Sequence, residues 1–113
     1  MKNLKRKTVA EFFEALKNFD NTVYAIDVTG KFKKDIKLAY NRNLNLELLE
    51  EVIHILAKGE KLEKKHNQHK LTGYKFELWE CHISPDWLMT WQQKDNELII
   101  LLVGTGTHSD LFG

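Results

Sequence analysis

The chain has 113 residues, a formal net charge of +1, 42% apolar residues and 29% charged residues, which predicts a single globular domain. Its longest apolar run is the short stretch from Leu98 to Val103, so we expect no membrane-spanning helix. The basic N-terminus lacks the apolar segment of a secretory signal, and the single cysteine, Cys81, excludes an internal disulfide. A reducing cytoplasm is therefore the expected location.

The charges are unevenly distributed along the chain. Residues 31–75 contain eleven Lys or Arg and six Asp or Glu, whereas residues 76–113 contain one Lys and six Asp or Glu. A basic middle joined to an acidic part that bears histidines suits a protein that binds a polyanion with one surface and does chemistry with another. A solvated helical face explains the lysines equally well, so charge alone leaves both interpretations open.

Three helices and one strand are predicted in the first half. Thr8, followed three residues later by Glu11, forms a capping-box pattern before apolar residues at helical spacing, which predicts an amphipathic helix over 8–19. The stretch VYAIDV (23–28) has the β-branched and aromatic content of a strand. Helices are expected over 31–42 and over 46–58, the second with Asn45 as its N-cap and Gly59 as its C-terminal stop.

The second half predicts three strands after a lysine-rich connector. They are expected at YKFELWECHI (74–83), WLMTWQ (87–92) and ELIILLV (97–103), and tight turns between them favour antiparallel pairing. The predicted fold class is α+β: a small twisted antiparallel sheet with helices packed on one side, plus an extra N-terminal helix. The expected division is an N-terminal extension, 1–22, followed by one domain, 23–113.

Five histidines are candidate chemical groups, and two constellations compete for them. In the first, His66 and His69 in an HxxH spacing bind a metal ion, with ligands completed by Cys81, His82 or His108. That spacing is loose, no CxxC pair occurs, and neighbouring strand residues point to opposite faces. His54 lies between apolar residues in a helix, and packing explains it. Histidines in a polar connector, as at 66 and 69, are most often solvated.

The second constellation is an acid–base cleft without a metal ion. The ends of the strands at 74–83 and 97–103 can lie at one sheet edge, so that His82, Asp86 and His108 meet there and the connector brings in His69. Imidazoles beside a carboxylate are the groups that a proton-transfer reaction requires near neutral pH. Cleavage of RNA by its own 2′-hydroxyl is such a reaction, since it needs a base, an acid and positive charge on the phosphate.

Four motifs carry a resemblance to a known family. FKKDIKLAYNR (32–42), HKLTG (69–73), CHISPDW (81–87) and GTGTHSDLFG (104–113), in this order, resemble the YafQ branch of the RelE/ParE superfamily, the toxins of bacterial type II toxin–antitoxin pairs. The resemblance covers the chain from about Tyr24 to its end. It implies a twisted antiparallel sheet with helices against one side, which agrees with the pattern above.

The resemblance also implies an activity. Such toxins are ribosome-dependent endoribonucleases that cleave messenger RNA on the 70S ribosome without a metal ion or cofactor, until a cognate antitoxin neutralises them. Promoter DNA is expected as a partner only for the toxin–antitoxin complex, and no membrane is expected. On the matching positions the family's catalytic residues fall on His69, His82, Asp86, His108 and Phe112. Trp87 matches the motif tryptophan, for which we expect packing. Lysines at the surface are expected to face ribosomal RNA phosphates, namely Lys61, Lys64, Lys65 and Lys70.

Two departures from the family pattern leave alternatives open. Family members usually carry arginine where this chain has Gly104, and loss of that cation on the phosphate predicts a weakened or inactive nuclease. Residues 1–22 precede the usual start, and their apolar face is expected to pack on this domain or on a partner. The alternative functions are a ParE-like gyrase-binding toxin and a regulatory protein that binds antitoxin without cleaving RNA. The histidines with Asp86 argue against the first.

Overall fold

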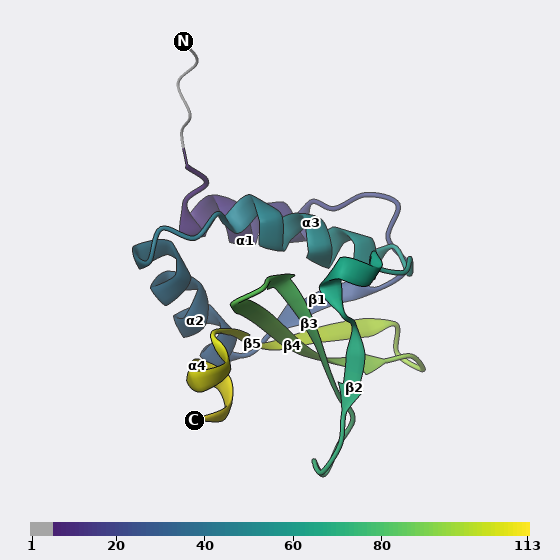
Figure 1. Ribbon diagram of the computed structural model, residues 1–113. Coiled ribbons are helices and arrows are strands. Elements are labelled where there is room, and N and C mark those ends of the chain that lie inside the picture. Colours follow the sequence, from purple (N-terminus) through teal and green to yellow (C-terminus); the bar gives the residue numbers. More distant parts are fainter. Residues whose placement is uncertain (1–5) are drawn as a thin grey trace.

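The computed structural model describes residues 6–113, which form an α+β fold, as expected. Its elements are helix α1 (Val9–Lys17), strand β1 (Ala25–Val28), helices α2 (Gly30–Asn41) and α3 (Leu46–Ala57), the short 3-10 helix η1 (Lys64–His66), strands β2 (His69–Leu71), β3 (Leu78–Ser84), β4 (Trp87–Lys94) and β5 (Ile99–Gly106), and helix α4 (His108–Phe112). α1 and α3 lie side by side across one side of the sheet, and α4 lies next to α2 (Figure 1). Within the described range, no helix has both the length and the apolar content needed to cross a membrane.

The sheet has five strands in the order β1-β5-β4-β3-β2. Strands β2 to β5 pair antiparallel, as their short connections predict. β1 pairs parallel to β5, with Ala25 opposite Ile99, and this pair was not expected from the sequence. In the sequence, all elements from α2 to β4 come between β1 and β5, so the connection is long enough for a parallel pairing.

Strand bounds differ from the sequence prediction in several strands: β1 begins at Ala25 rather than at residue 23, β4 ends at Lys94 rather than at residue 92, and β5 begins at Ile99 rather than at residue 97. β3 begins at Leu78 rather than at residue 74, and residues 72–77 form the exposed end of the β2–β3 hairpin. β2 was not predicted, because three residues in a polar connector carry no recognisable alternation. β5 continues beyond Val103 to Gly106. Its register with β4 shifts at Val103, between Thr90 and Trp91 of β4, and pairing then continues with Gly104 opposite Thr90.

The core lies between the helices and one face of the sheet. Alternate strand residues enter it together with one stripe from each long helix, and the largest of its members include Phe12, Phe32, Ile36, Leu49, Ile53, Cys81, Met89, Trp91, Ile100 and Leu102. Because strand side chains alternate between faces, Cys81 and Ile83 point into this core, whereas Glu80 and His82 point to the other face. That other face carries the polar groups of interest.

The N-terminal segment is part of this packing. The Thr8–Glu11 capping box is formed, and α1 buries Phe12 against Phe32, with ring centroids 6.4 Å apart. Arg6 donates to the carbonyl oxygen of Tyr40 at 2.6 Å, and Lys7 forms an ion pair with a glutamate of α3. Of the two outcomes expected for the apolar face of this segment, packing on the same chain is the one observed.

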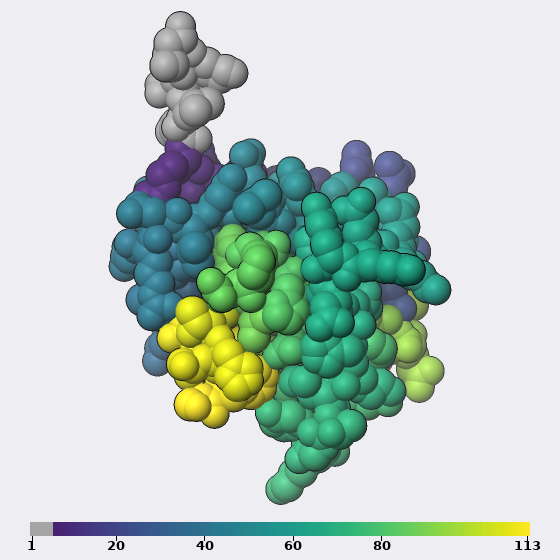
Figure 2. All heavy atoms as spheres, viewed as in Figure 1, coloured from purple at the N-terminus to yellow at the C-terminus, as the bar shows by residue number. Residues whose placement is uncertain are grey.

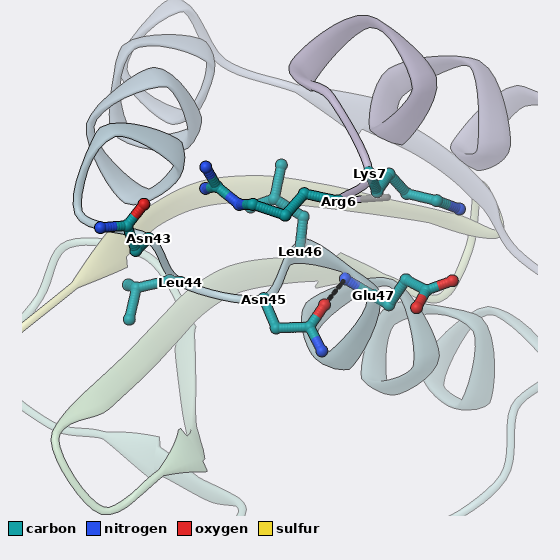
Figure 3. A pocket seen from close by; sticks show the side chains of 7 residues that line it. All are labelled: Arg6, Lys7, Asn43, Leu44, Asn45, Leu46 and Glu47. Carbon is teal, nitrogen blue, oxygen red and sulfur yellow. Dashed lines mark hydrogen bonds between the residues drawn. The ribbon is translucent and has the colours of Figure 1, made fainter. Parts of the chain in front are cut away.

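A hollow of about 540 Å³ lies where the N-terminal segment passes the loop between α2 and α3 (Figure 3). Arg6 and Lys7 line one side of it, and Asn45 lies on the other side. The Asn45 side chain accepts a hydrogen bond from the backbone N–H of Glu47, so it caps α3 as expected. No histidine lines this hollow, and the expected catalytic residues are elsewhere.

Candidate active site

Three of the expected catalytic residues line one hollow of about 450 Å³ at the carboxyl ends of β3 and β5. These are His82, Asp86 and His108, and the hollow is called the catalytic hollow below. Both β3 and β5 pair antiparallel with β4, so they run in the same direction and end at the same sheet edge. Leu88 of β4 lies directly between them, paired with His82 on one side and Gly106 on the other. The convergence expected from the sequence is therefore present.

His69 reaches this hollow through Glu80, a residue that the sequence prediction missed. The two residues face each other across β2 and β3, and His69 Nε2 lies 3.0 Å from Glu80 Oε1. Glu80 lines the catalytic hollow, and only 8% of its side chain is exposed. The sequence did contain a signal for Glu80. It lies two residues before His82 in a predicted strand, and residues i and i+2 of a strand share a face.

The hydrogen bonds of His69 define how many protons the pair holds. Its Nδ1 donates to the carbonyl oxygen of Asn67 at 2.7 Å, which fixes one ring proton. Asn67 has a left-handed backbone (φ 46°) that turns the chain from η1 into β2. A hydrogen bond between Nε2 and the Glu80 carboxyl group needs a second proton, because an unprotonated nitrogen and a carboxylate oxygen are both acceptors. The pair is therefore arranged to hold a proton beside the catalytic hollow.

His82 is held in one tautomer by the turn that follows it. Its Nδ1 donates to the carbonyl oxygen of Pro85 at 3.3 Å, which leaves Nε2 as the nitrogen that can accept a proton. Its own carbonyl oxygen accepts a hydrogen bond from Nδ1 of His66 at 2.6 Å. The expectation that His66 is solvated was wrong: its side chain is buried and ties η1 to β3.

His108 is the first residue of α4, and ionic contacts from α2 hold that helix. Thr107 and Asp110 form a capping box, and Arg42 binds both carboxylate oxygens of Asp110, at 2.6 and 3.4 Å. The Arg42 hydrogen bond, followed by the backbone N–H of Thr107, holds the pKa of Asp110 well below its usual range. The ring of Phe112 lies 5.0 Å from the ring of His108 and orients it. No residue of α4 is buried, so these contacts fix its place.

Gly104 lies in β5 close to α2 and α4. A Cβ atom at this position would lie 2.9 Å from Lys31 Nζ, 3.1 Å from Leu111 Cδ2 and 3.2 Å from Asp35 Oδ2. Lys31 and Asp35 form an ion pair at 2.7 Å, and Asp35 also accepts a hydrogen bond from the backbone N–H of Thr105. The space beside Gly104 is thus occupied by an ammonium group, although Lys31 does not line the catalytic hollow.

Three of the four expected RNA-binding lysines line two different hollows. Lys65 lines a hollow together with His82, next to the catalytic hollow. Lys61 and Lys64 line another hollow beside Trp79, and Lys70 Nζ lies 5.5 Å above the centre of the Trp79 ring.

Trp87 is buried and donates to the Thr105 hydroxyl at 2.9 Å, as its expected packing role requires.

The alternative metal site does not come together. Within residues 6–113, no group of three His, Cys, Asp or Glu side chains is placed to hold a metal ion. Cys81 points into the core, and burial, with a smaller effect from Glu80, raises the pKa of its thiol to about 12. This thiol therefore lies on the face of the sheet opposite to His82 and is not placed to share a metal ion with it.

Comparison with known proteins gives consistent matches over most of the chain. A family model described as "Bacterial toxin of type II toxin-antitoxin system, YafQ" matches residues 24–113. The mRNA interferase toxin YafQ of Escherichia coli K12 is 29% identical over 89 residues, which is 78% of this chain and 95% of that protein. The crystal structure of a metal-bound toxin from Helicobacter pylori is 38% identical, with a TM-score of 0.74, 77% of this chain and 97% of the other being covered. The E. coli DinJ–YafQ toxin–antitoxin complex gives 29% identity and a TM-score of 0.73, over 80% of this chain and 99% of that chain. The chain therefore belongs to the YafQ family of bacterial type II toxin–antitoxin toxins.

Proposed function

We propose that this toxin is an mRNA interferase, an endoribonuclease that cleaves messenger RNA on the ribosome. The observation that carries the proposal is the convergence of His82, Asp86 and His108 with the His69–Glu80 pair at one hollow. The relatives named mRNA interferase toxin YafQ support it. Proton donors and acceptors gathered at one point are the requirement of RNA cleavage by its own 2′-hydroxyl.

Each residue has a role in the proposed reaction. The 2′-hydroxyl loses its proton to Nε2 of His82 and attacks the adjacent phosphorus, so that a 2′-O–P bond forms as the P–5′-O bond breaks. His108 gives a proton to the departing 5′-oxygen, which leaves a cyclic phosphate and a 5′-hydroxyl. The protonated His69–Glu80 pair faces the phosphate charge, Asp86 orients the 2′-hydroxyl, and Phe112 holds the His108 ring. Side chains of this chain accept and donate every proton that the transesterification moves, so we propose a reaction without a metal ion or cofactor.

The proposed partners follow from the family. YafQ of E. coli has been solved in complex with DinJ, and we propose a cognate antitoxin for this chain as well. The 70S ribosome presents the messenger RNA, and Lys61, Lys64, Lys65 and Lys70 face RNA phosphates. Promoter DNA is bound only by the complex with antitoxin. Because messenger RNA is translated in the cytoplasm, we propose that location for the activity.

The rate is expected to be low because of Gly104. The resemblance implies an arginine at this position, and loss of one cation that stabilises the transition state costs on the order of a hundredfold in rate. Lys31 is the nearest cation, but its ammonium is bound to Asp35 rather than directed into the catalytic hollow. Gly104→Arg is expected to fold, because the Cβ atom meets only the ends of the Lys31, Leu111 and Asp35 side chains.

Ribosomes programmed with a defined messenger RNA test the proposal. Wild type and Gly104→Arg are added at equal concentrations, and the cleavage sites are mapped by primer extension. We expect cleavage at the same sites, faster by on the order of a hundredfold with arginine, and none with the double variant Gly104→Arg, His108→Gln. Absence of cleavage with both wild type and Gly104→Arg would favour the regulatory alternative, and inhibited DNA supercoiling by gyrase would favour the ParE-like one.

A further inference from the structure

A second hollow, of about 620 Å³, adjoins the catalytic hollow and is called the adjoining hollow below. The two hollows share His82 and Pro85, so His82 lies at the boundary between them. Figure 2 shows the C-terminal segment in yellow, the turn between β3 and β4 in green and the connector between α3 and β2 in teal next to one another on one face. A ligand that is bound at His82 can therefore occupy both hollows.

The lining of the adjoining hollow contains polar groups but no carboxylate. Besides the two shared residues, it consists of Lys65, His66, Asn67, Ile83 and Ser84. The catalytic hollow, in contrast, contains the carboxyl groups of Glu80 and Asp86. The exposed Lys65 is paired with Glu63 at 3.4 Å, a residue that does not line the adjoining hollow. A cation next to amide and hydroxyl groups suits a nucleotide, whose phosphate is anionic and whose base carries donors and acceptors.

The side chains of Asn67 and Ser84 are available to a ligand. Within residues 6–113, neither the Asn67 amide group nor the Ser84 hydroxyl forms a hydrogen bond. The Asn67 backbone is held on both sides, because its N–H donates to the carbonyl oxygen of Lys64 at 2.9 Å and its carbonyl oxygen accepts from His69 at 2.7 Å. η1 is itself tied to β3 by the His66 hydrogen bond. The position of Asn67 is thus fixed before any RNA binds.

The proposed mechanism decides which nucleotide lies at the adjoining hollow. His82 takes the proton of the 2′-hydroxyl, which belongs to the nucleotide on the 5′ side of the cleaved bond. His108 protonates the departing 5′-oxygen, which belongs to the nucleotide on the 3′ side, and His108 lines the catalytic hollow but not the adjoining one. The nucleotide on the 5′ side is therefore the one that is closer to Asn67 and Ser84.

We infer that the adjoining hollow is a subsite for the base on the 5′ side of the cleaved bond, with Asn67 and Ser84 hydrogen-bonded to the edge of that base and Lys65 facing a phosphate. The inference rests on the proposed function and adds to it the residues that select the cleavage site. RNA is favoured over an acidic peptide because the hollow shares His82 with the place where the RNA reacts. Hydrogen bonds to the edges of unpaired bases are the usual basis of sequence-specific RNA recognition. Asn67 and Ser84 therefore determine specificity and take no part in proton transfer.

Cleavage of four messenger RNAs tests this selectivity. The RNAs differ only in the base on the 5′ side of one mapped cut, and single-turnover rates are measured on programmed ribosomes with wild type or Gly104→Arg, whichever cleaves faster. Asn67→Gly removes the amide group and keeps a residue that readily adopts the left-handed backbone found here (φ 46°). We expect the parent protein to prefer one base, and Asn67→Gly to lower the rate with that base by about tenfold and to change the other rates little.

Three further variants separate base recognition from folding and from charge. Asn43→Gly makes the same change at another left-handed asparagine (φ 63°), which lines the hollow beside Arg6, and is expected to keep the base preference. Ser84→Ala is expected to weaken the preference for the same base as Asn67→Gly does. Lys65→Gln is expected to lower the rate equally with all four RNAs, because a phosphate contact carries no information about the base.

A photochemical crosslink locates the base directly. The nucleotide 4-thio-2′-deoxyuridine, placed on the 5′ side of the cut, removes the attacking hydroxyl and crosslinks under ultraviolet light to groups that contact its base. Crosslinks to residues 65–67 or 83–85 of the toxin support the inference, whereas crosslinks elsewhere on the toxin, or to the ribosome alone, overturn it. Equal rates for the four bases, or an equal loss with all four in Asn67→Gly, also overturn it. Absence of cleavage with both wild type and Gly104→Arg would instead contradict the proposed function, and the inference with it.

Discussion

Glu80→Gln tests the proton that the His69–Glu80 pair is arranged to hold. Glutamine keeps the size and shape of glutamate, so the packing around this buried side chain is retained. The amide N–H donates to an unprotonated His69 Nε2, and every hydrogen bond is then satisfied without the additional proton. The substitution thus changes the protonation of the pair while it preserves the fold.

The expected magnitudes for stability and activity differ widely. A charge-assisted hydrogen bond contributes about 1.5–3 kcal/mol and a neutral one about 0.5–1.5 kcal/mol, so the free energy of unfolding is expected to fall by about 1 kcal/mol. Loss of one hydrogen-bonding group that stabilises the charge of the transition state lowers the rate by about 10²–10³-fold. A loss of activity far larger than the loss of stability is therefore the expected signature of a catalytic role for Glu80.

Single-turnover cleavage on programmed ribosomes measures the rate at a series of pH values, in the wild type or Gly104→Arg background, whichever cleaves faster. Urea unfolding measures stability in the same buffer. Glu77→Gln is the matched control, because it makes the same chemical change at an exposed carboxylate that binds Lys70 outside the catalytic hollow. An unchanged rate and pH profile for Glu80→Gln would refute the proton-holding role, and an equal loss in Glu77→Gln would attribute the effect to net charge.

Three further predictions concern the fold around the site. Phe12→Ala is expected to lower the free energy of unfolding by about 3–5 kcal/mol in urea titration, because the ring is fully buried; a loss below 1 kcal/mol would mean that α1 does not pack as described. Asp110→Asn removes a carboxylate whose pKa is lowered in the folded state by Arg42. The carboxylate therefore stabilises wild type at pH values above its ordinary pKa of 3.8, and this stability is lost as the pH falls through the pKa of the folded state. The Tm difference between wild type and Asp110→Asn is expected to be full at pH 7 and to shrink below pH 3.8, and a constant difference would contradict the Arg42 contact. Cys81 is expected to react with a thiol reagent at pH 8 only at the rate of unfolding, because its thiol is buried and its pKa is about 12; rapid labelling of the native protein would contradict this.

Helices α1, α2 and α3 were predictable because their signals are local, whereas the short helix α4 was not predicted. The capping box at Thr8, the N-cap at Asn45 and the left-handed Gly59 (φ 77°) each depend on residues within one turn, and all are formed. The buried stripe of α3 was predicted for the same reason, since helical periodicity defines which face is apolar.

Features that depend on pairing between distant strands were not predictable to the same degree. β2 is only three residues long and is defined by its partner β3, not by its own sequence. The catalytic role proposed for Glu80 depends on the register that sets it opposite His69, and no local pattern reports that register. The convergence of His82 and His108 was predictable, because two strands antiparallel to the same neighbour must end at one edge.

The two parts of the proposed site are held by different elements. His69, Glu80 and His82 belong to adjacent strands, so hydrogen bonds of the sheet fix their relative positions. His108 belongs to a short helix without buried residues, whose position depends on the contact between Asp110 and Arg42, the C-cap of α2. A small movement of α2 therefore changes the distance between the proposed acid and the proposed base while the sheet stays intact. Since proton transfer requires groups within hydrogen-bond reach of the RNA, the contact between α2 and α4 determines whether the site is complete.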